Sequence, residues 1–150
     1  MPWKIAIKRA QGAEDLPLPS KATEQSVGFD LHANLPPGVD VRLGAGERRS
    51  IPCGIKLDLP WDWEAQIRPR SGLAFKHGIT VLNAPGTIDS DYRGEIAAIL
   101  VNHSGAPYTV RRGDRIAQII FARVDAVALE IVEDLSSTSR GEAGFGSSGK

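Results

Sequence analysis

Polar, charged and glycine residues gather in five short segments of the 150-residue chain. In chain order these are VGFDLHA (27–33), PRSGLA (69–74), GTIDSDYRGE (86–95), RGDRIAQ (112–118) and RGEAGFGSSGK (140–150). Each falls at a break in the surrounding apolar pattern, and each contains residue types that can hold or attack a phosphate group. Together the five segments predict a site for a triphosphate.

The arginines, serines and glycines of these segments suit phosphate binding. A guanidinium presents a rigid fork to phosphate oxygens, a hydroxyl donates a hydrogen bond, and a glycine lets backbone N–H groups approach an anion. The residues of these three kinds are Arg70, Arg115, Arg140, Ser71, Ser147, Ser148, Gly72, Gly146 and Gly149. The carboxylates Asp30, Asp89 and Asp91 can serve a hard cation or take a proton from a water. Each residue alone has an ordinary explanation, such as a turn or a surface ion pair, so the prediction depends on their co-occurrence.

Short strands must position these segments. The chain has 16 glycines and 10 prolines, about one residue in six, which is too many for a helical bundle. Strands are predicted over residues 3–8, 51–59, 61–68, 95–101, 115–121 and 124–132. One helical turn is predicted over residues 71–76, closed by Gly78. The pattern predicts a single all-β domain over residues 1–150, of the sandwich, jelly-roll or barrel kind, with a mobile glycine-rich tail.

Charge and cysteine content exclude several classes of protein. Lysine plus arginine and aspartate plus glutamate both number 18, so there is no basic excess for binding nucleic acid or a membrane surface. The single cysteine, Cys53, excludes an internal disulfide and a cysteine-based zinc site. The first ten residues contain no long apolar run, so neither a signal peptide nor a transmembrane span is predicted. The expected compartment is the cytoplasm.

In this order, the five segments resemble the five-motif pattern of the trimeric deoxyuridine triphosphate nucleotidohydrolases (dUTPases). All five match, and the resemblance extends from about Ile5 to Ser148. It implies an all-β, jelly-roll-like β-clip fold with one short helical segment. It also implies a homotrimer with three active sites at subunit interfaces. One subunit would supply the PRSGLA side, a second the hairpin that reads uracil, and a third the tail, with residues 136–150 as a flexible lid.

The family cleaves dUTP to dUMP and pyrophosphate using Mg²⁺, which keeps uracil out of DNA and supplies dUMP for thymidylate synthesis. The resemblance makes Asp89 the carboxylate that orients and deprotonates the water attacking the α-phosphorus in line. Asp30 is expected to act indirectly, through waters of the metal or by orienting a neighbour. Mg²⁺ itself would be gripped mainly by the three phosphates and completed by waters. The residues that match phosphate contacts of the first subunit are Arg70, Ser71, Gly72 and Gln118.

Residues 83–97 match the hairpin that reads uracil. Its fit would exclude thymine by a clash with the methyl group and cytosine by the wrong pattern of donors and acceptors. Tyr92 matches the ring that packs under the sugar and leaves no space for a 2′-hydroxyl. The groups expected to pair with the base edge are the Asn83 amide and backbone atoms near Thr87, Ile88 and Ala97.

The tail matches the segment that closes over bound substrate. Phe145 would stack on the uracil and complete a lid that excludes water. The residues expected to clasp the γ-phosphate are Arg140, Gly146, Ser147 and Ser148. Two residues depart from the family's usual pattern: Phe29 stands where Tyr is usual, and Ala143 where Gly is frequent. Ala143 puts the rate of lid closure in question, because alanine has fewer backbone conformations than glycine.

Two alternatives remain open at this point. One is a dCTP deaminase, or a bifunctional deaminase, of the same superfamily, although such chains are usually longer and carry a glutamate where they deaminate. The other is a non-catalytic protein that senses the nucleotide or regulates a partner. The intact GTIDSDY segment with Asp89 and the complete tail favour hydrolysis over both.

Overall fold

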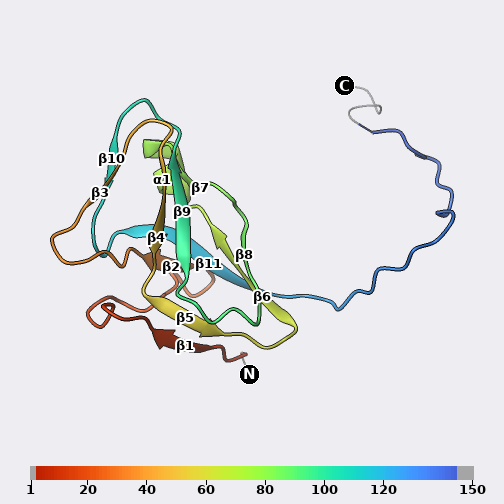
Figure 1. The fold of residues 1–150 in the computed structure, drawn as a ribbon, viewed down its shortest axis with the longest axis horizontal. Helices are drawn as coiled ribbons and strands as arrows, with labels where there is room; N and C mark the ends of the chain where they lie inside the picture. The colour runs from red at the N-terminus through yellow and green to blue at the C-terminus, as the bar shows by residue number, and fades with distance from the viewer. Residues whose placement is uncertain (1–2, 145–150) are drawn as a thin grey trace.

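Short strands dominate the computed structural model, which describes residues 3–144 and in that range contains eleven strands and one helix (Figure 1). Every paired strand runs antiparallel to its neighbour. The largest sheet has the order β2 (Phe29–His32), β11 (Arg115–Arg123), β6 (Trp63–Arg68), β8 (Gly86–Ile88). A second sheet has the order β4 (Arg48–Pro52), β9 (Ala97–Asn102), β7 (Ile79–Val81). Two smaller sheets pair β1 (Ala6–Arg9) with β5 (Ile55–Asp58) and β10 (Tyr108–Val110) with β3 (Val41–Leu43).

A single apolar cluster joins the two larger sheets. Leu31 and Ile119 come from the first sheet, and Ile51 and Leu100 come from the second; each is at most 1% exposed. Aliphatic side chains of this size each contribute about 2 kcal/mol when fully buried. The packed cluster therefore fixes the position of the loops at both ends of the sheets, where the predicted site residues lie.

The predicted helical turn is confirmed. Helix α1 spans Ser71–His77 and ends at Gly78, whose φ of 65° lies in the left-handed region. The Gly78 N–H donates to the carbonyl oxygens of Leu73 and Ala74, which satisfies groups left over at the end of the helix. The helix begins inside the PRSGLA segment, at Ser71, and so holds that segment at one end of β6.

The strand predicted over residues 51–59 is divided in two. Strand β4 ends at Pro52 and β5 begins at Ile55, because the chain bends at Gly54, whose φ is 74°. A side chain at Gly54 would also meet the Cβ of Ala13 at 2.8 Å. The alternating apolar pattern does not reveal this break, since Ile51, Cys53, Ile55 and Leu57 are all buried on both sides of it.

The aromatic ends of two predicted strands lie outside the sheets. Strand β1 begins only at Ala6, and Trp3 is 68% exposed. The strand predicted over residues 61–68 begins at Trp63, and Trp61, which lies in the preceding turn, is 79% exposed.

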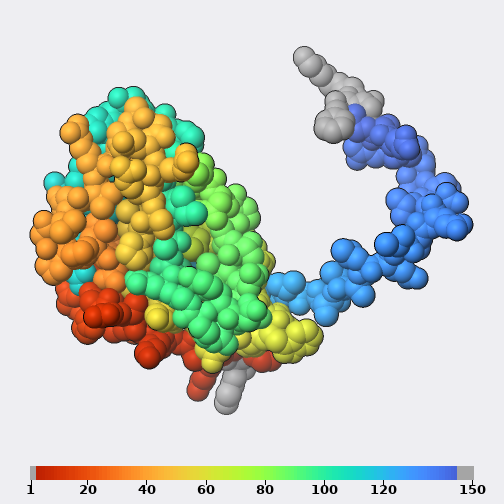
Figure 2. Space-filling model, viewed as in Figure 1, coloured from red at the N-terminus to blue at the C-terminus, as the bar shows by residue number. Residues whose placement is uncertain are grey.

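The strand predicted over residues 124–132 is wrong. Beyond Arg123 the chain leaves the body and runs outward to residue 144 without a helix or strand (Figures 1 and 2). Val127, Leu129 and Ile131 are 83%, 98% and 100% exposed. A strand needs a neighbour for its backbone N–H and C=O groups, and none of the described strands of this chain pairs with the segment. Within residues 3–144, the chain also contains no helix with the length and apolarity needed to cross a membrane.

Candidate active site

Strands β2, β11 and β6 bring two of the five segments into one row. In their registers Gln118 of β11 pairs with Asp30 of β2 on one side and with Arg68 of β6 on the other. Residues in register share a face of a sheet, so Asp30 and Gln118 lie side by side. Arg70 follows two residues after Arg68, which places the PRSGLA turn at the end of the same row.

Asp30 forms an ion pair with each of two arginines. Its Oδ1 accepts from Nε of Arg70 at 3.1 Å, and its Oδ2 accepts from Nη1 of Arg115 at 3.1 Å. Arg70 also donates to the backbone carbonyl of Arg115 at 3.1 Å. The Asp30 side chain is only 16% exposed, so its pairing is partly shielded from water. The cluster keeps one net positive charge and holds two guanidinium groups in fixed directions, an arrangement suited to phosphate oxygens.

His32 stands next to this cluster, opposite Arg115 in the β2–β11 register. Burial lowers the pKa of its imidazole, the nearby Asp30 acts in the opposite direction, and Arg115 and Arg70 lower it further. The imidazole is therefore neutral at pH 7 and adds no charge to the cluster.

Gln118 holds the PRSGLA turn in place. Its Nε2 donates to the carbonyl oxygen of Pro69 at 2.9 Å. A side chain at Gly28 would lie 3.0 Å from Cδ of Gln118 and closer still to Oε1, so the amide occupies the space that Gly28 leaves. The Asp30 and Gln118 side chains thus frame a polar hollow of about 180 Å³. Its lining is Asp30, Arg70, Ser71, Gly72 and Gln118, and we call it the phosphate hollow.

A second group of predicted residues surrounds the turn between β8 and β9. The Tyr92 N–H donates to the carbonyl oxygen of Asp89 at 3.2 Å, which closes the turn. Arg93 braces it from outside, donating to the Ser90 carbonyl at 2.6 Å and pairing with Asp58 of β5 at 2.5 Å. Asp89 is exposed at this turn and available to a ligand.

This turn borders a second hollow, of about 240 Å³, which we call the hairpin hollow. Its lining is Ser50, Thr87, Ile88, Asp89, Tyr92, Glu95, Ala97 and Ile99. Five of the predicted residues are among these. Asn83 is not; its amide lies against Gly86, where an added Cβ would be 3.2 Å from Nδ2.

The two hollows of one chain lie at opposite ends of β6. Gly86 pairs with Ile67 and Ile88 with Ala65, so β8 runs away from the PRSGLA turn and delivers Asp89 beyond Ala65. Six residues, or about 20 Å at about 3.3 Å per residue, separate that level of β6 from Arg70. Figure 1 shows the same separation: α1 and the β8–β9 loop lie at opposite ends of β9. Each hollow is smaller than the roughly 300 Å³ of an ordinary small-molecule site.

The sequence matches one protein family over most of its length. The dUTPase family model covers residues 14–149. The chain belongs to the dUTPase family. A relative from Methylocella silvestris, named Deoxyuridine 5'-triphosphate nucleotidohydrolase, is 50% identical over 148 residues, which cover 99% of this chain and 92% of the relative. Hydrolysis of dUTP is accordingly the activity of this chain, as of its family.

Solved dUTPase structures share the fold. A Staphylococcus bacteriophage 80alpha dUTPase mutant, solved with dUpNHpp, superposes with a TM-score of 0.85 at 21% identity, covering 98% of this chain and 99% of that one. A mutant dUTPase from phage phi11 of S. aureus, whose structure describes the coordination of a structural Mg(II) ion, gives a TM-score of 0.77 at 18% identity. That match covers 89% of this chain and 99% of the phage chain. The jelly-roll-like dUTPase fold is thereby confirmed.

The described part of the tail motif, residues 140–144, lines neither hollow. Arg140 is exposed and donates from Nε to the carbonyl oxygen of Ala143 at 2.7 Å, on the segment that stands apart from the body in Figure 2. The tail residues Phe145, Gly146, Ser147 and Ser148 lie outside the described residues. Their roles remain predictions.

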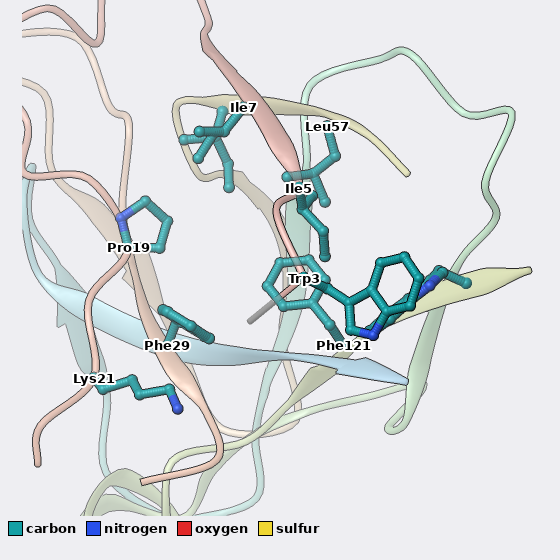
Figure 3. Close-up of a pocket in the computed structure, with 10 residues that line it drawn as sticks. Trp3, Ile5, Ile7, Pro19, Lys21, Phe29, Leu57 and Phe121 are labelled. Atoms are coloured by element: carbon teal, nitrogen blue, oxygen red, sulfur yellow. The ribbon is translucent and has the colours of Figure 1, made fainter. Parts of the chain in front are cut away.

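A further groove in the described part of the chain has the wrong chemistry for a nucleoside triphosphate. This groove of about 400 Å³ is lined mainly by aromatic and aliphatic side chains, among them Trp3, Phe29 and Phe121, with Lys21 as its one charged residue (Figure 3). The Phe29 and Phe121 rings meet edge to face, with their centroids 5.8 Å apart. None of the predicted site residues lines it. The groove is larger than both the phosphate hollow and the hairpin hollow, so volume alone does not identify the active site of this dUTPase.

Sequence reasoning missed the residues that act by making space or by holding a neighbour. Gly28 admits the Gln118 amide, and Gly94 admits the Tyr92 ring, yet both read as ordinary turn glycines. Glu95, which follows Gly94 in the sequence, lines the hairpin hollow and was not among the predicted site residues. Their one signal in the sequence was their place inside two of the five segments.

Proposed function

We propose that the phosphate hollow of one chain and the hairpin hollow of another form each active site of a cytoplasmic homotrimer. The observation that carries this proposal is the distance of about 20 Å along β6 between Arg70 and the level of Asp89. A base must come within hydrogen-bond reach of the water it activates, so Asp89 cannot serve a phosphate held by Arg70 of its own chain. Two chains placed with unlike hollows together remove this difficulty.

In this site Asp89 accepts a proton from the water that attacks the α-phosphorus in line. Its exposure at the tip of a closed turn supports the role, because the carboxylate is accessible and its backbone is held by the Tyr92 N–H. Proton transfer to a positioned carboxylate contributes about 10²- to 10⁴-fold to a rate. Pyrophosphate then leaves, and dUMP remains as the product that supplies thymidylate synthesis.

Arg70, Ser71 and Gly72 bind the phosphates from the other chain. Asp30 supports them by holding the guanidinium of Arg70, so less side-chain freedom is lost when the substrate binds. Gln118 holds the turn through Pro69 and can reach the same hollow with its amide. The result is a preorganised charge for the negative oxygens that develop during the reaction.

The described residues fit a Mg²⁺ ion that is held by the triphosphate. Residues 3–144 contain no cluster of three or more histidines, cysteines and carboxylates that could cage a metal. Both oxygens of Asp30 accept from arginines, which favours an orienting role, with any metal contact passing through water. When bound, Mg²⁺ would neutralise phosphate charge and fix the conformation of the triphosphate.

The hairpin hollow reads the nucleoside. Backbone groups of Thr87, Ile88 and Ala97 would pair with the uracil edge, with the Asn83 amide at the margin of the hollow. Tyr92 would pack under the sugar and exclude a 2′-hydroxyl. The tail of a third chain would close the site, with Phe145 stacked on the base. Its contacts to the γ-phosphate would come from Arg140, Gly146, Ser147 and Ser148.

Pyrophosphate release from four nucleotides tests this function. With Mg²⁺ present, dUTP should be cleaved while dTTP, dCTP and UTP release little, and a chelator should reduce the dUTP rate strongly. A second measurement, of ammonia released from dCTP, detects the activity that a deaminase would have. Ammonia release, or equal cleavage of dUTP and UTP, would contradict the proposal.

A further inference from the structure

The Tyr92 ring folds back over Gly94. A Cβ built on Gly94 would lie 2.9 Å from Cε2 of Tyr92, and closer still to Cζ and the phenolic oxygen. Real Cβ atoms do not approach other atoms so closely, so any other residue at 94 would displace the ring. The φ of Gly94 is not in the left-handed region, which means that the backbone itself does not require glycine here. The ring is the reason for the missing side chain.

The next residue receives the end of the same ring. The Tyr92 hydroxyl donates to the backbone carbonyl of Glu95 at 3.2 Å. Gly94 thus leaves the space that the outer end of the ring occupies, and the Glu95 carbonyl accepts from the hydroxyl. We call these two contacts the Tyr92 seat: the Gly94 backbone and the Glu95 carbonyl.

The Glu95 side chain anchors the seat to the body of the protein. Its Oε1 accepts from the Gly54 N–H at 2.8 Å and from Nδ2 of Asn34 at 3.0 Å. Asn34 is itself held, because its Oδ1 accepts from Nη1 of Arg112 at 3.1 Å. Arg112 in turn pairs with Asp15 and donates to the Leu35 carbonyl at 2.5 Å. The segment that leads into β9 is therefore fixed, at Glu95, to Gly54 and Asn34, which are distant in sequence.

These contacts serve more than closure of the hairpin. The Tyr92 N–H to Asp89 carbonyl bond and the Arg93–Asp58 ion pair already close and brace the turn. Neither of them involves the Tyr92 ring or needs a glycine at 94. The seat is the part of the structure that determines where the ring stands in the hairpin hollow.

We infer that Gly94 and Glu95 are positioning residues for sugar selectivity, acting through Tyr92. The inference rests on the proposed role of Tyr92 as the group that excludes a 2′-hydroxyl. The sugars of dUTP and UTP differ by one hydroxyl group. The Tyr92 ring can exclude that group only if the ring cannot move aside to make room for the extra oxygen. The Tyr92 ring meets that condition, because its outer end lies against Gly94 and Glu95 in a segment that is tied to Gly54 and Asn34.

The test compares the ratio of kcat/KM for dUTP to kcat/KM for UTP in a set of variants. Gly94→Ala displaces the ring and should lower this ratio about tenfold, since misplacement by an ångström can cost up to about 10²-fold. Glu95→Ala releases both bonds to Oε1 and should lower the ratio about fivefold. Glu95→Gln should restore it, because one side-chain oxygen makes both bonds. Gly105→Ala is the matched control, since an added Cβ there meets nothing within 4 Å and φ is not in the left-handed region.

The variant Tyr92→Ala distinguishes failure of this inference from failure of the proposed role of Tyr92 in excluding a 2′-hydroxyl. If Tyr92→Ala leaves the ratio unchanged, Tyr92 does not exclude the 2′-hydroxyl, and the role inferred for the Tyr92 seat is wrong as well. The other outcome is that Tyr92→Ala lowers the ratio while Gly94→Ala and Glu95→Ala leave it within about twofold of the unaltered chain. That result keeps Tyr92 as the group that excludes a 2′-hydroxyl and contradicts the positioning role of Gly94 and Glu95. Should Gly94→Ala fail to fold, as judged by thermal unfolding, the Glu95→Ala and Glu95→Gln pair decides. In that case the same loss of selectivity in both Glu95 variants overturns the role of the side chain.

Discussion

The two hollows of the chain are built by different physical means. The phosphate hollow is held by charge: Asp30 of β2 pairs with Arg115 of β11 and with Arg70, which precedes helix α1. The hairpin hollow is held by backbone hydrogen bonds and by shape, with the Tyr92 ring over Gly94. The difference matches what each must recognise. A triphosphate is identified by its charge, whereas uracil and deoxyribose differ from their competitors by single small groups.

The largest effect is expected from the carboxylate of the hairpin hollow. Asp89→Asn should lower kcat about 10³-fold with little change in dUTP binding, because the amide keeps the shape but cannot take a proton from water. Single-turnover rates and equilibrium binding of dUTP measure the two effects separately. Near-normal turnover would remove Asp89 as the base.

Removal of the tail should have the next largest effect. Deleting residues 140–150 should lower kcat/KM for dUTP about 10²-fold, because a lid that excludes water and adds phosphate contacts is lost. The described part of this segment makes no contact with the core, so the size of the oligomer should not change. Size-exclusion chromatography provides the check, and dissociation of the shortened protein would contradict a pure lid role.

A smaller effect is expected when the charge that organises the phosphate hollow is removed. Asp30→Asn should lower kcat/KM about tenfold, mainly through KM, because the two arginines lose their common partner before substrate binds. Asp62→Asn is the matched control: Asp62 pairs with Arg123 at 2.7 Å, and neither residue lines the phosphate hollow. Equal losses in the two variants would mean that Asp30 contributes only general stability.

The smallest expected effect concerns shape within the phosphate hollow. Gly28→Ala brings a Cβ against the Gln118 amide and should break its bond to the Pro69 carbonyl. We expect a loss of about fivefold in kcat/KM and about 1 kcal/mol in the free energy of unfolding. Thermal unfolding and steady-state kinetics measure the two. An unchanged KM would show that Gln118 is not needed to hold the turn.

The sequence predicted elements that depend on local chemistry and missed those that depend on distant contacts. The helix that begins inside the PRSGLA segment, and its end at Gly78, follow from residue types that lie close together in the sequence. The break at Gly54 does not follow from local residue types, because the space at Gly54 is limited by Ala13, which lies far away in the sequence. The apolar alternation of residues 124–132 predicted a strand, but no described strand of the same chain pairs with it.

The candidate site shows the same division. Motif residues such as Arg70 and Asp89 were identified from the sequence by their resemblance to a family. Their placement at opposite ends of β6 required the strand registers. The supporting roles of Gly28 and Gly94 required the side chains of Gln118 and Tyr92.

Mixing two inactive variants tests the sharing of sites between chains most directly. Arg70→Ala and Asp89→Asn would be co-expressed and purified as mixed oligomers, and their dUTP hydrolysis compared with that of each variant alone. If every site takes Arg70 from one chain and Asp89 from another, roughly a quarter of the sites regain both residues in random assembly, and activity rises to that fraction of the unaltered enzyme. If activity stays at the level of the separate variants, each site is built within a single chain and the account is wrong.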